Sequence, residues 1–168
     1  MTWAPHLLHQ AFFGGLAAAG FGILFNFGLR ALPWPAAAGA LALGVRAALL
    51  SAGWSLESAS FVAALSCAAA LFPFRRRLGP AAGAIALAGC IPMIPGAFFG
   101  DALLGFLAVS SPVAQHADAT LVKSLQSLLR VFFTLAAIGA GLAIPSQIFG
   151  RSRLTQENAH VPQHLHRL

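Results

Sequence analysis

Three ionisable residues lie inside otherwise apolar stretches of this sequence: Arg46, Asp101 and Arg130. Charge at membrane depth is costly unless it is paired, hydrated or able to reach the headgroups. A guanidinium group presents a fork of N–H donors that matches the two oxygens of a carboxylate. If Asp101 neutralises one arginine, the remaining positive charge suits a ligand that carries a carboxylate. The alternative is that both arginines snorkel toward the membrane surface and bind nothing.

The segment Gly89–Gly96 carries two prolines three residues apart, Pro92 and Pro95, with a glycine at each end. Each proline removes a backbone donor and clashes with the carbonyl four residues earlier, so an unbroken helix is not expected here. Carbonyls freed at membrane depth need protein or water as partners, and interrupted spans line the substrate sites of many secondary transporters. Pro92, Pro95 and Gly96 are therefore candidate substrate-binding residues. The alternative is a structural kink without a ligand.

Asn26 belongs to a series that recurs every four residues: Gly14, Ala18, Gly22, Asn26 and Arg30. In a helix this spacing places all five on one face. Small residues on such a face let two membrane helices approach closely. Asn26 is thus a candidate for a neutral hydrogen bond to the ligand, or else for a hydrogen bond that joins two helices.

No residue pattern typical of an enzyme is found. Ser/His/Asp and Cys/His arrangements with catalytic spacing, HExxH and paired intramembrane aspartates are all missing from the sequence. His160, His164 and His166 lie in a polar tail with no cysteine and no acidic residue beyond Glu157, and we expect that tail to be disordered. The sequence therefore predicts neither catalysis nor a bound metal or cofactor.

The composition points to a membrane protein. Of 168 residues, 58% are hydrophobic and only 8% are charged, whereas a soluble domain carries roughly a quarter charged residues. The net charge of +6 does not indicate nucleic-acid binding, because no basic stripe with interleaved aromatic residues exists. Cys67 and Cys90 fall inside apolar runs and are expected to be small buried residues rather than a disulfide. We predict an all-α integral membrane protein.

Five membrane-spanning helices account for the apolar runs, each long enough to cross a hydrocarbon core of about 30 Å. The predicted spans are about 7–29, 33–51, 56–74, 80–109 and 121–149. Residues 1–150 then form one transmembrane domain, and residues 151–168 a polar cytoplasmic tail. The fourth span is longer than one straight crossing and is expected to be broken at its Pro-x-x-Pro-Gly segment.

The distribution of arginines predicts the orientation. With five spans, Arg30, the run Arg75–Arg77, Arg151 and Arg153 all fall on one side, which is the cytoplasmic side by the positive-inside rule. Omitting the second span would place Arg30 and Arg46 outside. We therefore expect the N-terminus outside and the C-terminus in the cytoplasm.

Four stretches resemble, in order, the threonine/serine exporter family, and most closely its short YjjB-like subunit. They are residues 24–32, Gly44–Arg46, 91–96 and 141–145, within a resemblance that runs from about residue 10 to 150. One departure is at Leu43, near which close relatives place a polar residue, a histidine. This difference argues against a proton relay at that turn of the second helix, and for a different substrate.

The resemblance implies a multi-pass secondary exporter of the bacterial inner membrane. Fused members of the family join two membrane halves in one chain, and this chain resembles only the shorter half, which implies a larger YjjP-like membrane subunit as partner. Fused members are associated with threonine and serine export, and the split pair with succinate export. Both kinds of substrate carry carboxylates.

We therefore expect the small membrane subunit of a two-component secondary exporter of carboxylate-bearing metabolites. Two alternatives remain at this point: a structural or assembly subunit that does not transport, and a self-sufficient homo-oligomeric channel. A gene for a polytopic partner beside this one would favour the exporter.

Overall fold

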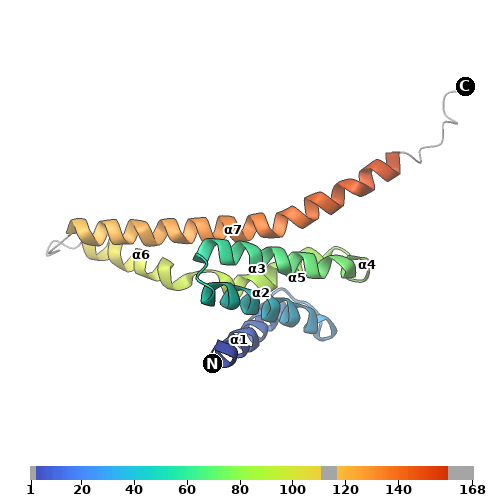
Figure 1. Ribbon diagram of the computed structural model, residues 1–168, viewed down its shortest axis with the longest axis horizontal. Coiled ribbons are helices and arrows are strands. Elements are labelled where there is room, and N and C mark those ends of the chain that lie inside the picture. Colours follow the sequence, from blue (N-terminus) through green and yellow to red (C-terminus); the bar gives the residue numbers. More distant parts are fainter. Residues whose placement is uncertain (1–2, 111–116, 159–168) are drawn as a thin grey trace, which may run out of the picture.

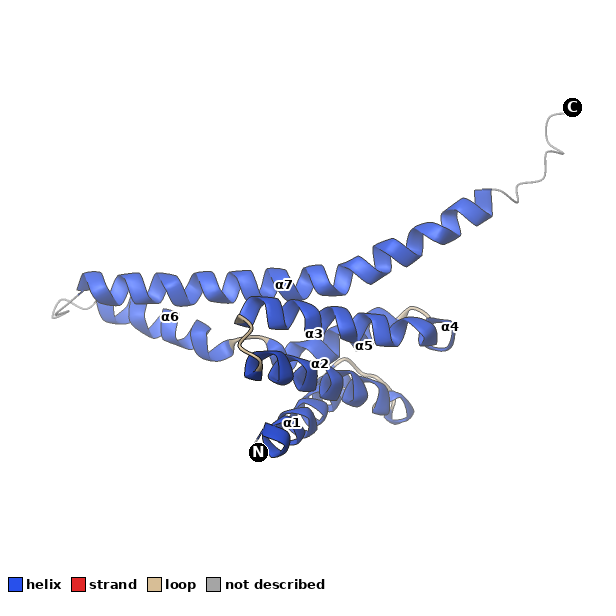
Figure 2. Ribbon diagram, in the orientation of Figure 1, coloured by secondary structure: helices blue, strands red, loops and turns tan. Residues whose placement is uncertain are grey.

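The computed structural model describes residues 3–110 and 117–158, and over these ranges it contains helices and no strand. Figure 1 shows the arrangement, and Figure 2 shows how short the loops between the helices are. The α-helices are α1 (Trp3–Leu24), α2 (Pro33–Ser51), α3 (Leu56–Leu71), α4 (Arg75–Leu78), α5 (Ala81–Cys90), α6 (Gly96–Val109) and α7 (Ala117–Asn158). Short 3-10 helices, η1 (Leu29–Ala31), η2 (Phe72–Phe74) and η3 (Ile91–Met93), connect them. The predicted all-helical fold is confirmed.

Four of the apolar helical segments are long enough to cross a membrane, and a fifth arises if a bent pair counts as one span. The four are Pro5–Leu24, Leu29–Ser51, Leu56–Leu78 and Asp118–Pro145. The pair is Ala81–Met93 with Gly96–Val109, bent by 55°. Neither member of the pair reaches the roughly 20 residues that a crossing needs. The chain is thus a multi-pass membrane protein with four to five spans.

Small side chains fill the interior and large ones cover the outside. Most buried apolar residues are alanines, whereas Leu8, Leu24, Leu104 and Phe132 are among the large side chains that are more than 60% exposed. A soluble fold would bury such residues. In lipid the outer leucines cost nothing, and small interior residues let the helices pack by van der Waals contact.

Two helix pairs show this close packing. Gly14 of α1 lies so near α2 that an added Cβ would come within 2.7 Å of Leu43 Cβ and 2.9 Å of the Gly39 carbonyl oxygen. Gly141 of α7 is equally confined by α3, where a Cβ would lie 2.7 Å from the Phe61 carbonyl oxygen. These contacts join α1 to α2 and α3 to α7, and they account for the buried glycines in both pairs.

The buried hydroxyl groups find partners within their own helices. Ser60, Ser124 and Thr134 each donate to the carbonyl four residues earlier, at 2.7–2.8 Å. Within the described part of the chain, no buried side-chain nitrogen or oxygen lacks a partner. Internal satisfaction of this kind is required where no water reaches.

The last helix, α7, is 42 residues long with Pro145 inside it. It pairs with α6 over its N-terminal part and with α3 farther along, and it bends toward its C-terminal end in Figure 1. The helix continues to Asn158, past the predicted end of the span at 149, so the first residues assigned to the polar tail are helical. The tail histidines His160, His164 and His166 lie outside the described residues.

Candidate functional site at the interruption between α5 and α6

The chain leaves the helical path between α5 and α6 at Ile94 and Pro95. Pro92 stays within η3, whereas Ile94 is extended (φ −61°, ψ 127°) and Pro95 has ψ 68°. Gly96 then begins α6, and its N–H donates to the Ile94 carbonyl. Only two of the five residues in Pro92–Gly96 are thus outside a helix. The extended residue precedes a proline, a position that disfavours helical backbone.

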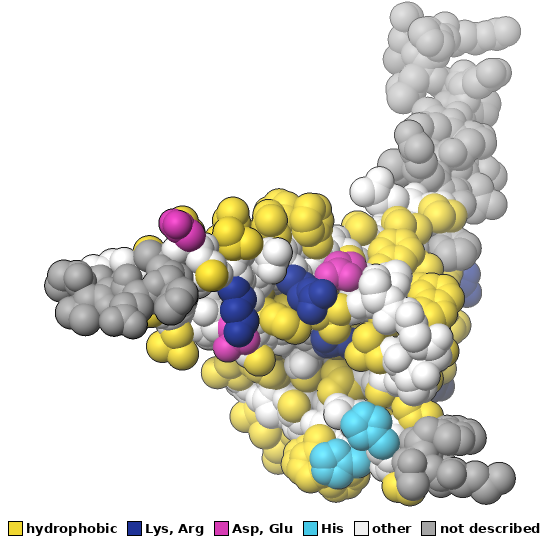
Figure 3. Space-filling model, turned by 60° about the vertical axis from the view of Figure 1, so that its left-hand side comes forward, with side chains coloured by type: hydrophobic (Ala, Val, Ile, Leu, Met, Phe, Trp, Pro, Cys, Tyr) yellow, Lys and Arg dark blue, Asp and Glu magenta, His cyan; other side chains and the backbone are white. Residues whose placement is uncertain are grey.

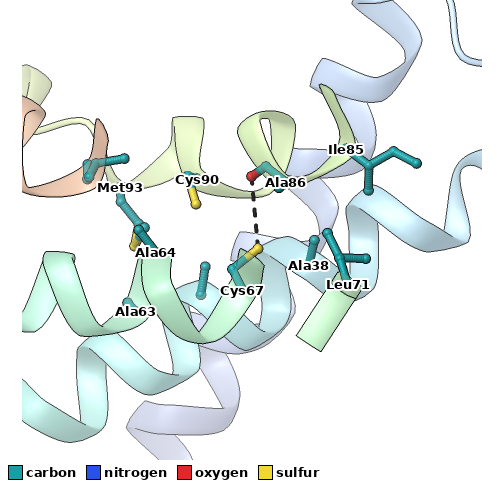
Figure 4. Close-up of a cluster of buried hydrophobic side chains, with 11 residues drawn as sticks. Ala38, Ala63, Ala64, Cys67, Leu71, Ile85, Ala86, Cys90 and Met93 are labelled. Carbon is teal, nitrogen blue, oxygen red and sulfur yellow. Dashed lines mark hydrogen bonds between the residues drawn. The ribbon is translucent and has the colours of Figure 1, made fainter. Parts of the chain in front are cut away.

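A tightly packed core holds the η3 side of this interruption (Figure 4). Met93 and Cys90 are buried there with Ala64 and Cys67 of α3. The Cys67 thiol lies 3.9 Å from the Ala86 carbonyl oxygen. Both cysteines are free and buried, which confirms the prediction of small buried residues rather than a disulfide. The interruption is therefore backed by side chains that fix its position.

Arg46 binds the interrupted segment directly. Its Nη1 donates a hydrogen bond of 2.5 Å to the Met93 carbonyl oxygen. Because the helix ends beside Met93, the Met93 carbonyl has no backbone N–H donor in the regular helical position. A hydrogen bond from a charged donor is worth about 1.5–3 kcal/mol. Arg46 is half-buried, so it supplies the protein partner that a freed carbonyl at membrane depth requires.

A hollow of about 480 Å³ lies beside Arg46. Its lining comes from three elements: His6 and Gln10 of α1, Leu43, Arg46, Ala47, Leu50 and Ser51 of α2, and Pro92 of η3. Besides the guanidinium, it offers an imidazole and an amide, and among the residues that the structure describes no acidic side chain lines it. The Ser51 hydroxyl also borders the hollow but already donates to the Ala48 carbonyl at 2.7 Å. These donors, together with the positive charge, suit an anion such as a carboxylate.

Arg130 lies in a different hollow, on the α6 side of the interruption. Its Nε is 3.9 Å from Glu57 Oε1, and its guanidinium carbon is 5.2 Å from the centre of the Phe98 ring. The hollow measures about 610 Å³, and Lys123, Gln126 and Ser127 also line it. The two predicted arginines therefore do not share one cavity.

Asp101 does not neutralise either arginine in the structure. It is exposed and lines a third hollow together with Lys123, while the acidic partner of Arg130 is Glu57. Glu57 is the second residue of α3, where a carboxylate also stabilises the helix N-terminus. The predicted pairing of Asp101 with an arginine is wrong because α3, rather than α6, places its acid beside Arg130.

Asn26 is not on a helix face. The helix α1 ends at Leu24, and Asn26 follows in a left-handed conformation (φ 58°) with an exposed side chain. The Phe27 N–H donates to Gly22 and the Asn26 N–H to Ile23, the hydrogen-bond pattern of a Schellman cap. Asparagine is the usual substitute for glycine at that position. Asn26 therefore ends the helix instead of lying on its small-residue face, and its role toward a ligand stays a prediction.

In the structure Arg46 and Pro92 line one hollow, and Arg130 lines another. Pro95 and Gly96 lie between Pro92 and Arg130 in the chain. Sequence reasoning missed His6, Gln10, Ser51, Glu57 and Phe98 as lining residues. Two of these residues could have been suggested by their positions in the sequence. Ser51 and Glu57 flank the short turn between α2 and α3, near the membrane depth at which charged residues were already expected.

The sequence matches a known protein family. The sequence profile described as threonine/serine exporter, ThrE, matches residues 10–148. That range includes the interruption, Arg46 and Arg130. No solved structure matches the chain.

Proposed function

Because this chain belongs to the threonine/serine exporter family, we propose that it is the small subunit of a two-component secondary exporter of carboxylate-bearing metabolites. The family supports a membrane exporter role, and the four to five apolar spans are consistent with it. The proposal adds the two-component arrangement, the substrate class and the residues that bind it. We place the protein in the bacterial inner membrane with the N-terminus outside.

The observation that carries the proposal is the contact between Arg46 and the interrupted segment. One guanidinium nitrogen holds the Met93 carbonyl, and the same side chain lines the hollow that contains Gln10, Ser51 and His6. A carboxylate in this hollow would meet a positive charge and neutral hydrogen-bond donors. Because Arg46 is hydrogen-bonded to the segment between α5 and α6, binding of an anion to Arg46 would change the geometry of that segment.

The substrate candidates are threonine, serine and a succinate-type dicarboxylate. All three carry a carboxylate that a guanidinium can bind. The partner is a larger YjjP-like membrane subunit, since the sequence resembles only the shorter half of the fused exporters. Large apolar side chains, such as Phe132 on α7 and Leu104 on α6, are exposed on the outer surface, where such a subunit as well as lipid would contact them.

Metabolite release from cells tests the proposal. Cells that lack related exporters would produce this chain alone, the partner alone, both or neither, and threonine, serine and succinate would be measured in the medium. We expect release only with both chains. Release with this chain alone would favour a homo-oligomeric channel, and no release above background in any strain would favour a structural subunit.

A further inference from the structure

A small hollow lies where α3, α5 and α7 meet, at the end of α3 that leads into α4. Its volume is about 100 Å³. Arg75 is the one charged side chain among the described residues that line it, and the others, from α3, η2, α5 and α7, are apolar. The Arg75 guanidinium carbon lies 5.4 Å from the centre of the Phe72 ring, which also lines the hollow. Because Arg75 is exposed, the hollow combines apolar walls with a positive charge at its open edge.

The hollow lies at the edge of the apolar part of the molecule. Two of the candidate membrane spans, Leu56–Leu78 and Asp118–Pro145, end beside it. Close by, the rings of Trp34 in α2 and Phe74 in η2 pack with their centres 4.9 Å apart, and tryptophan is enriched where a membrane helix reaches the lipid headgroups. Figure 3 shows hydrophobic side chains spread over the face of the molecule that it draws. The hollow is therefore placed where acyl chains meet headgroups.

The positive charge beside the hollow is not balanced by an acid. Arg75–Arg77 are three consecutive exposed arginines in α4. None of the three forms an ion pair with another side chain that the structure describes. Glu57 is at the other end of α3, a helix of 16 residues that is about 24 Å long. Asp118 is in the first turn of α7, and Figure 1 shows that turn at the end of the molecule opposite α4. The arginine run therefore lacks an anionic partner within the described fold.

We propose that the hollow and the arginine run bind an anionic glycerophospholipid. The lipid phosphate accepts hydrogen bonds from the Arg75 guanidinium, and Arg76 and Arg77 add positive charge. The first methylene groups of one acyl chain occupy the hollow, whose volume of about 100 Å³ holds only a few of them. Basic pockets between membrane helices at the level of the headgroups are suited to lipids of this class. With the C-terminus in the cytoplasm, as proposed above, the site faces the inner leaflet.

The arginines select the charge of the ligand, and the hollow selects a lipid. An acyl chain that enters the hollow leaves a bilayer that is equally apolar, so its burial does not favour one headgroup over another. A zwitterionic lipid carries an ammonium group beyond its phosphate, which the arginine run repels. Inorganic phosphate has the negative charge but no chain to fill the hollow. A Cβ added to Gly83 would meet nothing within 4 Å, so the space for that chain is open.

Native mass spectrometry of the purified full chain in neutral detergent tests the selection by charge. Phosphatidylglycerol and phosphatidylethanolamine with identical acyl chains are added in equal amounts, and the two bound populations are compared. The unaltered chain should prefer phosphatidylglycerol roughly fivefold or more. Arg75→Gln should lower this preference roughly fivefold, the effect of one basic residue near an anionic lipid surface. The matched control is Arg30→Gln, an exposed arginine on the same predicted side that does not line the hollow. The control should keep the preference.

A second variant tests the hollow without changing the charge. Gly83→Leu fills the open space and should lower the bound phosphatidylglycerol several-fold, whereas Gly20→Leu should not. Gly20 is an exposed helical glycine whose added Cβ also meets nothing within 4 Å, and it does not line the hollow. Size-exclusion chromatography compares the folding of all variants.

Four results would overturn the inference. They are equal binding of the two lipids by the unaltered chain, the same loss of preference in Arg75→Gln and Arg30→Gln, equal phosphatidylglycerol binding by Gly83→Leu and Gly20→Leu, and displacement of the lipid by an excess of inorganic phosphate. The last result would mean that the arginines bind a phosphate group alone.

Discussion

At the scale of single residues, Arg46 joins two parts of the chain that the sequence could not connect. Its position inside an apolar run was visible, and a carboxylate or the membrane surface was the expected destination of the charge. The structure adds the Met93 carbonyl, which lies 47 residues away along the chain. A partner of this kind depends on how α2 packs against α5 and η3, and no local pattern encodes that packing.

Arg46→Lys should reduce export roughly tenfold or more while the protein level in the membrane stays the same. Lysine keeps the charge but loses the planar fork, so it cannot hold the Met93 carbonyl and a carboxylate together in the same geometry. The matched control is Arg76→Lys, an exposed arginine outside both hollows, which should export normally. The measurement is the initial rate of threonine and succinate release. Equal rates in both variants would mean that Arg46 acts as a charge alone.

The placements of Asn26 and Asp101 differ from those expected from the sequence, and both differences have identifiable causes. The four-residue spacing from Gly14 to Arg30 continued smoothly through Asn26, and nothing in a spacing argument marks where the helix ends. The left-handed cap at Asn26 is a backbone event. Asp101 was expected to pair with an arginine because it is the acidic residue inside a predicted span, whereas the packing of α3 against α7 brings Glu57 to Arg130.

At the scale of elements, the spans could be predicted because hydropathy measures how favourably a segment enters the lipid bilayer. The predicted second span, 33–51, coincides with α2 (Pro33–Ser51). The ends of the first and last spans were less accurate: α1 ends at Leu24, and α7 begins at Ala117 and continues to Asn158. Composition shows which residues tolerate lipid, but caps and the polar extension of a helix decide where it ends.

Gly141→Ala should destabilise the contact between α3 and α7. Its new methyl group would lie 2.7 Å from the Phe61 carbonyl oxygen and 2.9 Å from Ala64 Cβ, and backbone cannot move aside cheaply. Overpacking of this kind costs about 1–3 kcal/mol. Gly139→Ala, two residues earlier on the same helix, meets nothing within 4 Å and should be neutral or slightly stabilising. Thermal aggregation in detergent, followed by size-exclusion chromatography, compares them, and equal midpoints would contradict the packing.

The bend between α5 and α6 should depend on its prolines. Spin labels at the exposed positions Ala84 and Leu104, in a background with both native cysteines replaced by alanine, report the length across the bend. Twenty residues of straight helix span about 30 Å, and a 55° bend at the midpoint shortens this to about 27 Å. Pro92→Ala/Pro95→Ala should lengthen the distance by about 3 Å. An unchanged distance would assign the bend to packing around Met93 instead.

At the scale of the whole molecule, the predicted orientation places residue 4 outside and residue 155 in the cytoplasm. Single cysteines introduced at these two positions, with Cys67 and Cys90 replaced by alanine, should react differently with a membrane-impermeant maleimide added to intact cells. We expect labelling at position 4 only, and labelling at both positions once the membrane is permeabilised. Reaction of both in intact cells would remove one span, and with it the five-span arrangement.

The molecule as a whole presents large apolar side chains outward and fills its interior with small ones. This pattern, rather than any single motif, is what the sequence conveyed well, because it follows from composition and from the positions of the prolines. The division of the charges between two hollows could not be predicted, since it depends on which helix lies on each side of the break.

Transport by the purified two-chain assembly in proteoliposomes tests the central claim most directly. Vesicles loaded with unlabelled substrate would take up labelled threonine or succinate by exchange, with the unaltered chain or with Arg46→Leu. The Arg46→Leu chain should incorporate into the vesicles to the same extent but show exchange reduced to background, because the hollow beside Pro92 has lost the charged donor that Arg46 supplies. Exchange by Arg46→Leu at the unaltered rate would contradict the account and leave Arg46 as an anchor at the membrane surface.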